Sequence, residues 1–245
     1  MQESLLILKV GEPPAVVAQE FGAYERWFLW RLEGMSPALP TVVHDMRLGP
    51  PEGLPAALLI TGAPESLHDP LPWLPEARQY LKRAIAAGVP MLGVCFGHQL
   101  LCELLGGTVG PNPRGWELGT AEISLTPDGL QDPLFEGLNS PLYCHETHRD
   151  VVLELPPGAI VLAQTALDPH HALRLRERVW SVQFHPEMRA MHVGAVIASY
   201  APRLHNAQLD LGLKRGELVL EALKSMKEED DGAAILQRFL NVAVG

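Results

Sequence analysis

One cysteine lies in a glycine-flanked segment that has the layout of a nucleophile elbow. Cys95 stands between Gly93 and Gly97, after the apolar run 89–92 and before the apolar, helix-like run 100–105. A strand, a tight turn and a helix therefore follow one another, and such a turn presents a nucleophile at the end of a sheet. The pattern predicts that Cys95 is a nucleophile. The competing interpretation is a small buried hydrophobic residue, the commonest fate of an intracellular cysteine.

A base and an orienting carboxylate occur together later in the chain. The strand-like run 179–184 leads directly into His185, Pro186 and Glu187. A cysteine nucleophile needs a general base, and the base needs a group that fixes its ring. We therefore expect His185 to act as the base and Glu187 to orient it, provided that the fold brings both to Cys95.

These segments resemble the class I (triad) glutamine amidotransferases, and most of all the stand-alone relatives of the glutaminase domain of GMP synthetase. Two further segments extend the resemblance. Residues 60–66, Ile-Thr-Gly-Ala-Pro-Glu-Ser, are similar to the family's Gly-Gly-Pro-Glu-Ser turn, and residues 147–150, Thr-His-Arg-Asp, are similar to its Ser-His-x-Asp segment. The four motifs occur in the family's order, and the resemblance covers about the first 200 residues.

The resemblance implies an enzyme with a Cys-His-Glu triad formed by Cys95, His185 and Glu187. The cysteine would attack the side-chain amide of glutamine, release ammonia and leave a γ-glutamyl thioester that water hydrolyses to glutamate. The oxyanion would be held by the backbone N–H groups of Ala63 and Phe96. The residues that the resemblance assigns to substrate binding are Gly62, Gln99, Thr147 and His148.

Ala63 departs from the family pattern, because the family usually has a second glycine at this place. Alanine disfavours positive φ, so we expect the Ala63 N–H to be less freely aimed than a glycine N–H. This predicts weak glutaminase activity in the absence of a partner.

Three functional hypotheses remain open. The first is a glutaminase that passes ammonia to an unknown acceptor or to a synthetase partner in trans, since the chain contains no Walker-type phosphate loop. The second is a self-sufficient γ-glutamyl hydrolase or peptidase. The third is a non-catalytic relative that binds a partner. Glutamine or a γ-glutamyl compound is the expected substrate, and no cofactor is implied.

Composition narrows the range of partners and compartments. The chain has 245 residues and a formal net charge of −10 without a basic run, which argues against nucleic-acid binding. The apolar run 5–10 is too short to span a membrane, and three cysteines do not make a disulfide framework. We expect a cytoplasmic protein. Residues 145–148 do not have the spacing of a zinc-binding His-Glu-x-x-His motif, so no metal site is predicted.

The alternation of apolar runs with Gly and Pro predicts an α/β fold, and the resemblance implies a mostly parallel, flavodoxin-like central sheet flanked by helices. We expect a single domain over residues 1–245, with a catalytic core of about 1–200 and a C-terminal helical extension of about 201–245. The predicted strands are 5–10, 41–44, 57–61, 89–94, 118–125, 160–164, 172–175 and 180–184. The predicted helices are 21–30, 74–87, 96–105, 213–227 and 233–244. The acidic run 228–232 is expected to be a solvated loop, and the last two helices to cover the sheet or to form a homodimer contact.

Overall fold

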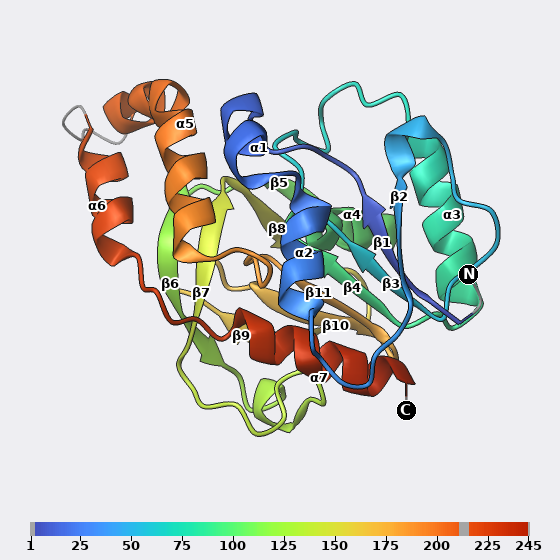
Figure 1. Cartoon of the computed structure of the whole chain (residues 1–245). Coiled ribbons are helices and arrows are strands. Elements are labelled where there is room, and N and C mark those ends of the chain that lie inside the picture. The colour runs from blue at the N-terminus through green and yellow to red at the C-terminus, as the bar shows by residue number, and fades with distance from the viewer. Residues whose placement is uncertain (1–2, 211–215, 245) are drawn as a thin grey trace.

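Five adjacent parallel strands form one half of a large central sheet. The computed structural model describes residues 3–210 and 216–244. In the order β2-β1-β3-β4-β11, the strands pair in parallel (Figure 1). Their bounds are β1 Leu5–Lys9, β2 Thr41–Asp45, β3 Ala57–Ile60, β4 Met91–Val94 and β11 Val179–Val182. The carboxyl ends of β3, β4 and β11 therefore lie side by side at one edge of the sheet, where ligands of α/β sheets bind.

Antiparallel strands complete the sheet beyond β11. They follow in the order β10-β9-β6-β7, which gives nine strands in all. Their bounds are β6 Glu117–Leu125, β7 Leu142–His148, β9 Ile160–Gln164 and β10 Ala172–Arg176, while β5 Thr108–Pro111 and β8 Asp150–Glu154 form a separate antiparallel pair. The prediction of an α/β fold with a large, helix-flanked central sheet is confirmed.

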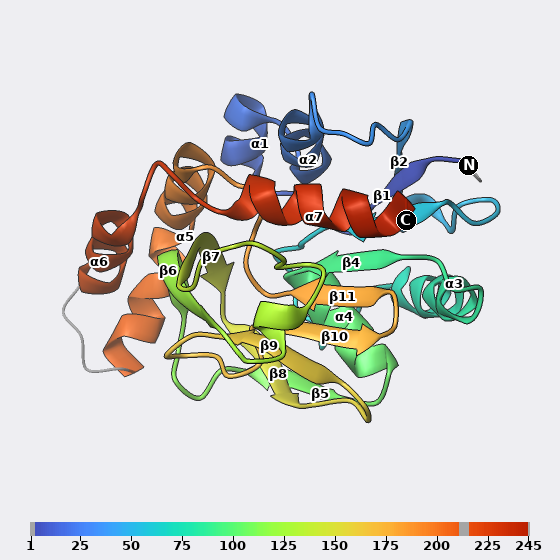
Figure 2. The ribbon, with the colours of Figure 1, turned by 90° about the horizontal axis from the view of Figure 1, so that it is seen from below.

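Helices cover both faces of the parallel half (Figure 2). The alternation of side chains along a strand decides what each face contacts. On β1, Leu5 belongs to the core that contains Phe28 of α2 (Tyr24–Leu32) and Phe239 of α7 (Gly232–Val244). Its neighbour Leu6 belongs to the core that contains Tyr80 of α3 (Leu74–Ala86) and residues of α4 (Phe96–Leu104). The C-terminal helix α7 thus shares its hydrophobic core with the sheet.

A third group of helices packs at the β6–β7 end of the molecule. These are α1 (Ala15–Phe21), α5 (Ala190–Asp210) and α6 (Glu217–Ser225), and they share a cluster with Trp27 of α2. Two short 3₁₀ helices, Met46–Leu48 and Gly129–Gln131, complete the elements. Among the described residues, no helix combines the length and the apolar character needed to cross a membrane.

Several sequence predictions of secondary structure were wrong in detail. The helix predicted over 21–30 begins only at Tyr24, because Gly22 takes a φ of +78° and ends α1, a helix that was not predicted. The strand predicted over 180–184 ends at Val182, and the predicted helix 213–227 is described only as Glu217–Ser225, with residues 213–215 outside the described part. The long helix α5 and the strands β5, β7 and β8 were not predicted.

The acidic run 228–232 is not simply a solvated loop. The Asp230 side chain is only 3% exposed and accepts a hydrogen bond from Arg31, and Asp231 accepts one from the Tyr143 N–H at 2.7 Å. Carboxylates are buried at low cost only when they are paired in this way. Charge density alone could not reveal these partners, because they come from α2 and β7.

Candidate active site

Cys95 occupies a strained turn between β4 and α4. It has φ +51° and ψ −104°, and it is the only non-glycine residue with positive φ in the described part of the chain. Glycines make the turn sterically feasible: a Cβ on Gly93 would lie 2.5 Å from the Gly97 oxygen, and one on Gly97 would lie 2.8 Å from the Ile60 oxygen. Cys95 is 6% exposed. A costly backbone conformation held by its surroundings is typical of functional sites.

His185 and Glu187 form a buried pair beyond the end of β11. His185 Nδ1 lies 2.7 Å from Glu187 Oε1, and both side chains are almost completely buried. The backbone N–H of His185 donates a hydrogen bond to the His145 carbonyl at 2.9 Å. This bond fixes the main chain from which the imidazole projects. Because Glu187 accepts from the Nδ1–H, the Nε2 atom is left to face the reacting groups.

Gly62 brings the cysteine and the histidine into one place. A Cβ built on Gly62 would lie 2.9 Å from His185 Cε1 and 3.4 Å from Cys95 Cβ. Cys95 and His185 therefore both lie against the same backbone, and any side chain at residue 62 would push into the space between them. These residues follow the carboxyl ends of β3, β4 and β11. They lie close together because parallel neighbouring strands end at the same edge of the sheet.

The charge state of His185 is set by its neighbours. Burial lowers the pKa of an imidazole, but the Glu187 carboxylate and Cys95 outweigh this effect and raise the pKa of His185 well above its ordinary value. The other two cysteines differ: burial raises the pKa of Cys102 and of Cys144 well above that of an ordinary thiol. These two thiols are therefore inert near neutral pH.

A pocket of about 210 Å³ opens next to Cys95. Of the predicted site residues, the structure places Ala63, Cys95, Gln99, Thr147 and His148 in its wall. The Thr147 hydroxyl lies 3.2 Å from His185 Nε2, so the segment 147–150 reaches the imidazole of His185. The Gln99 amide donates to the Asp150 carbonyl at 2.8 Å and to Gln183 at 3.1 Å, contacts that fix its side chain in the wall.

The turn after β3 holds Ala63 without strain. Ala63 is not among the residues with positive φ, which alanine disfavours. A Cβ on Gly11 would lie 2.5 Å from the Ala63 Cβ, which shows that Gly11 makes room for the Ala63 methyl group. Phe96, the other predicted donor, is the first residue of α4, where backbone N–H groups have no partner within the helix.

Several pocket residues were missed in the sequence. Tyr200 and Arg203 come from α5, the helix that was not predicted, and Trp116 precedes β6. The Arg203 guanidinium lies 5.6 Å from the centre of the Tyr200 ring, and the Trp116 and Tyr200 rings are 6.3 Å apart. A correct assignment of α5 would have shown that Tyr200 and Arg203 lie one turn apart on a single face. The other pocket residues outside the prediction are Pro64, Glu65, Ser66, Asp69, Arg149 and Asp150.

Comparison with known proteins agrees with this fold. The family model for glutamine amidotransferase class I matches residues 42–198. The chain belongs to the class I glutamine amidotransferase family. It is 33% identical over 231 residues to a protein of Aeropyrum pernix named GMP synthase (glutamine-hydrolyzing), a match that covers 90% of this chain and 42% of that protein. A GMP synthase of Thermus thermophilus is 35% identical over 157 residues, which cover 64% of this chain and 29% of that protein. The chain thus spans less than half of the length of these relatives.

Solved structures show the same fold. A glutamine amidotransferase from Thermotoga maritima has a TM-score of 0.69 and 16% sequence identity, and the match covers 100% of this chain and 99% of that one. A glutamine amidotransferase from Methylobacillus flagellatus has a TM-score of 0.70 at 23% identity, with 98% of this chain and 91% of that one covered.

Proposed function

We propose that this protein hydrolyses the side-chain amide of glutamine through a triad of Cys95, His185 and Glu187. The single observation that carries the proposal is the 2.7 Å contact of His185 Nδ1 with Glu187, next to a cysteine held at positive φ across Gly62. Family membership supports the reaction type, because relatives are named as glutamine-hydrolyzing enzymes. The catalytic, oxyanion and substrate-binding roles named from the sequence are part of this proposal.

The residues present account for each step. His185 takes the thiol proton of Cys95, the sulfur attacks the amide carbon, and the C=O electrons move onto an oxygen that the Ala63 and Phe96 N–H groups would stabilise. His185 donates its Nε2 proton to the departing nitrogen, so that ammonia leaves and a γ-glutamyl thioester remains. His185 then takes a proton from water, the hydroxide attacks the thioester, and glutamate and the free thiol result. Glu187 stabilises the imidazolium in both half-reactions.

The ammonia is passed to an acceptor or to a synthetase partner, whose identity stays open. The relatives named GMP synthase suggest this division of labour, since the chain matches less than half of their length. The pocket wall also fits a second function. The Trp116 and Tyr200 rings and Arg203 could contact a substrate whose leaving group is larger than ammonia. This observation favours a self-sufficient γ-glutamyl hydrolase or peptidase as the second candidate. A non-catalytic, partner-binding role is the third.

Steady-state kinetics separates the candidates. We expect glutamate release from glutamine to be measurable in the wild type and abolished in Cys95→Ala. Replacing Ala63 by Gly should raise kcat/KM for glutamine if backbone freedom limits the oxyanion donor. Faster unaided cleavage of any γ-glutamyl peptide than of glutamine would favour the hydrolase, and no turnover of either, with or without cell extract, would favour the binding role.

The remaining expectations stay predictions. A single domain over residues 1–245 agrees with the core that α7 shares with the sheet. A cytoplasmic location agrees with three cysteines that are all free. Association with a second copy and the lack of nucleic-acid partners are expectations for solution experiments.

A further inference from the structure

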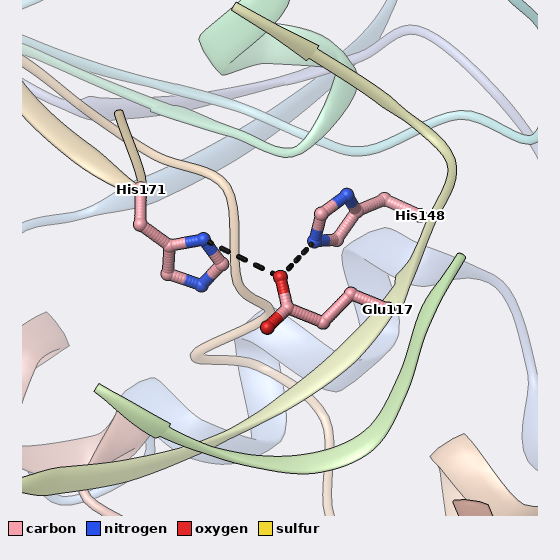
Figure 3. A group of neighbouring side chains, drawn as sticks. All are labelled: Glu117, His148 and His171. Atoms are coloured by element: carbon pink, nitrogen blue, oxygen red, sulfur yellow. Dashed lines mark ion pairs between the residues drawn. The ribbon is translucent and has the colours of Figure 1, made fainter. Parts of the chain in front are cut away.

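Five titratable side chains gather behind the pocket wall. Glu117 begins β6, Glu146 and His148 lie on the same face of β7, and Asp168 and His171 precede β10. All are buried, with exposures between 0% and 7%. Figure 3 shows Glu117, His148 and His171 with their polar atoms directed at one another. Glu117, Glu146, Asp168 and His171 have no role in the proposed reaction, whereas His148 also lines the pocket and is a proposed substrate-binding residue.

Three donor atoms converge in this cluster, which consists of Glu117, Glu146, His148, Asp168 and His171. Glu117 Oε2 lies 3.3 Å from His148 Nε2 and 3.9 Å from His171 Nδ1, and ligand atoms of these three residues all lie within 4.8 Å of one another. Two donors bound to one tetrahedral Zn²⁺ lie about 3.3–3.5 Å apart, given bonds of about 2.0–2.2 Å. The Glu117–His148 separation falls within this range, and the Glu117–His171 separation is a few tenths of an ångström longer.

Two of the three donor atoms, and one oxygen of Glu146, lack an aligned hydrogen bond to the described part of the chain. Within the described residues, Glu117 Oε2, His148 Nε2 and Glu146 Oε2 are buried and have no correctly aligned hydrogen-bond partner. His148 Nε2 lies 3.3 Å from a carboxylate oxygen of both Glu117 and Glu146, although it can give its one proton to only one of them. Buried polar atoms of this kind are costly unless something else binds them.

His171 is held in the orientation that a metal ligand needs. Its Nε2 atom lies 2.9 Å from Glu146 Oε1, and its Nδ1 atom is 3.2 Å from Asp168 Oδ2 and 3.9 Å from Glu117 Oε2. When Glu146 accepts from the Nε2–H, the Nδ1 atom can ligate a cation that takes the place of its contact with Asp168. Asp168 Oδ2 is then a fourth donor atom beside the site.

Charge balance requires a positive partner. Glu117, Glu146 and Asp168 place three carboxylates in a region from which water is excluded. Two imidazolium ions or one divalent cation with neutral imidazoles would supply the same positive charge. The misaligned contacts of His148 favour the cation, because an imidazolium would be expected to turn one N–H straight toward a carboxylate.

We propose that Glu117, His148 and His171 bind one divalent cation of the Zn²⁺ type, which ties β6, β7 and the segment before β10 together behind the pocket. The role is structural, since the cation would fix the end of β7 that presents Thr147 to His185. The proposal goes beyond glutamine hydrolysis and does not depend on it.

Metal titration of the untagged full-length chain tests the proposal. After treatment with a chelator, the protein is titrated with Zn²⁺ and with Co²⁺, and bound metal, visible Co²⁺ absorption and Tm are measured. We expect about one ion per chain, the intense absorption of tetrahedral Co²⁺ and a Tm that rises with free Zn²⁺. Glu146→Gln should weaken metal affinity about 10- to 100-fold, because it removes the acceptor of the His171 N–H.

The matched control is His170→Gln in the same segment. His170 Nδ1 lies 2.7 Å from the Val152 carbonyl, away from the three donors. His171→Gln should abolish binding while His170→Gln retains it. Equal loss in both variants, or a wild-type chain that takes up neither metal and keeps its Tm unchanged, would overturn the proposal in favour of a network of imidazolium ions. The wild-type titration decides the question even if a cluster variant fails to fold.

Discussion

Arg31 and Asp230 form a buried ion pair that supports the loop carrying Glu187 from outside the family-matched region. Arg31 Nη2 lies 2.6 Å from Asp230 Oδ2, with side chains only 11% and 3% exposed. The same guanidinium donates to the backbone carbonyls of Met188 and, at 3.5 Å, Glu187. Burial would raise the pKa of Asp230, but hydrogen bonds from His145 and Arg31 lower it below its ordinary value. Residues before 42 and after 198 therefore hold the segment that carries Glu187.

Removing this pair should loosen the triad. Asp230→Asn keeps the shape but removes the charge, and Arg31→Met removes the donors to both carbonyls. We expect kcat for glutamine to fall about tenfold or more with little change in KM, because small displacements of a catalytic group are costly. The loss of one partner of a buried pair should also lower the free energy of unfolding by about 3–5 kcal/mol.

Glu229→Gln is the control, since Glu229 lies in the same acidic run but is exposed. It should leave both kcat and Tm unchanged. In the double variant Arg31→Met with Asp230→Asn, the loss of unfolding free energy should be smaller than the sum of the losses in the two single variants. If Asp230→Asn lowers Tm but leaves kcat at the wild-type value, the pair supports the fold alone.

A glutamine-mimicking electrophile should label Cys95 once and spare the other thiols. Cys102 and Cys144 are fully buried, and burial raises the pKa of each above that of an ordinary thiol. Peptide mapping by mass spectrometry measures the labelled positions, and Cys95→Ala should take up no label. Equal modification of all three cysteines would contradict the assignment of the nucleophile.

The backbone strain at Cys95 should appear as a difference in unfolding free energy between two variants of this residue. At φ +51° and ψ −104°, a glycine is favoured over a residue with a Cβ. We expect Cys95→Gly to be more stable than Cys95→Ala by about 1 kcal/mol in chemical unfolding, and both variants to be inactive.

Cys102 is the control position for this comparison, because it lies in α4 and does not have positive φ. There the glycine variant should be less stable than the alanine variant by about 0.5–1 kcal/mol. The same order at both positions would show that the elbow is not strained in solution.

The charge on His185 should depend on Glu187. Glu187→Gln removes the carboxylate that raises the pKa of His185, so this pKa should fall. Because the protonated imidazole serves the departing nitrogen, the alkaline limb of the pH profile of kcat/KM should move to lower pH. His185→Ala should be as inactive as Cys95→Ala, and Glu187→Gln should retain more activity than either. An alkaline limb that stays in place, or a Glu187→Gln variant less active than His185→Ala, would contradict this assignment.

The sequence by itself determined the local chemistry. The glycines at 93 and 97 around Cys95 are needed by a strand, turn and helix that meet within a few residues. The two-residue spacing of His185 and Glu187 likewise permits their contact within one loop. Such short-range features follow from backbone sterics, and the parallel strands then bring three strand ends together.

Only the tertiary structure decided the long-range contacts. Glu117, His148 and His171 show no motif spacing, and they meet because β6 and β7 pair while the segment before β10 folds beside them. Asp230 belongs to an acidic run that composition alone assigns to solvent, yet α2 supplies Arg31 to bury it. Polar groups pair in a protein interior because desolvation makes an unpaired charge costly, and the chain reveals which groups pair only once its distant elements pack together.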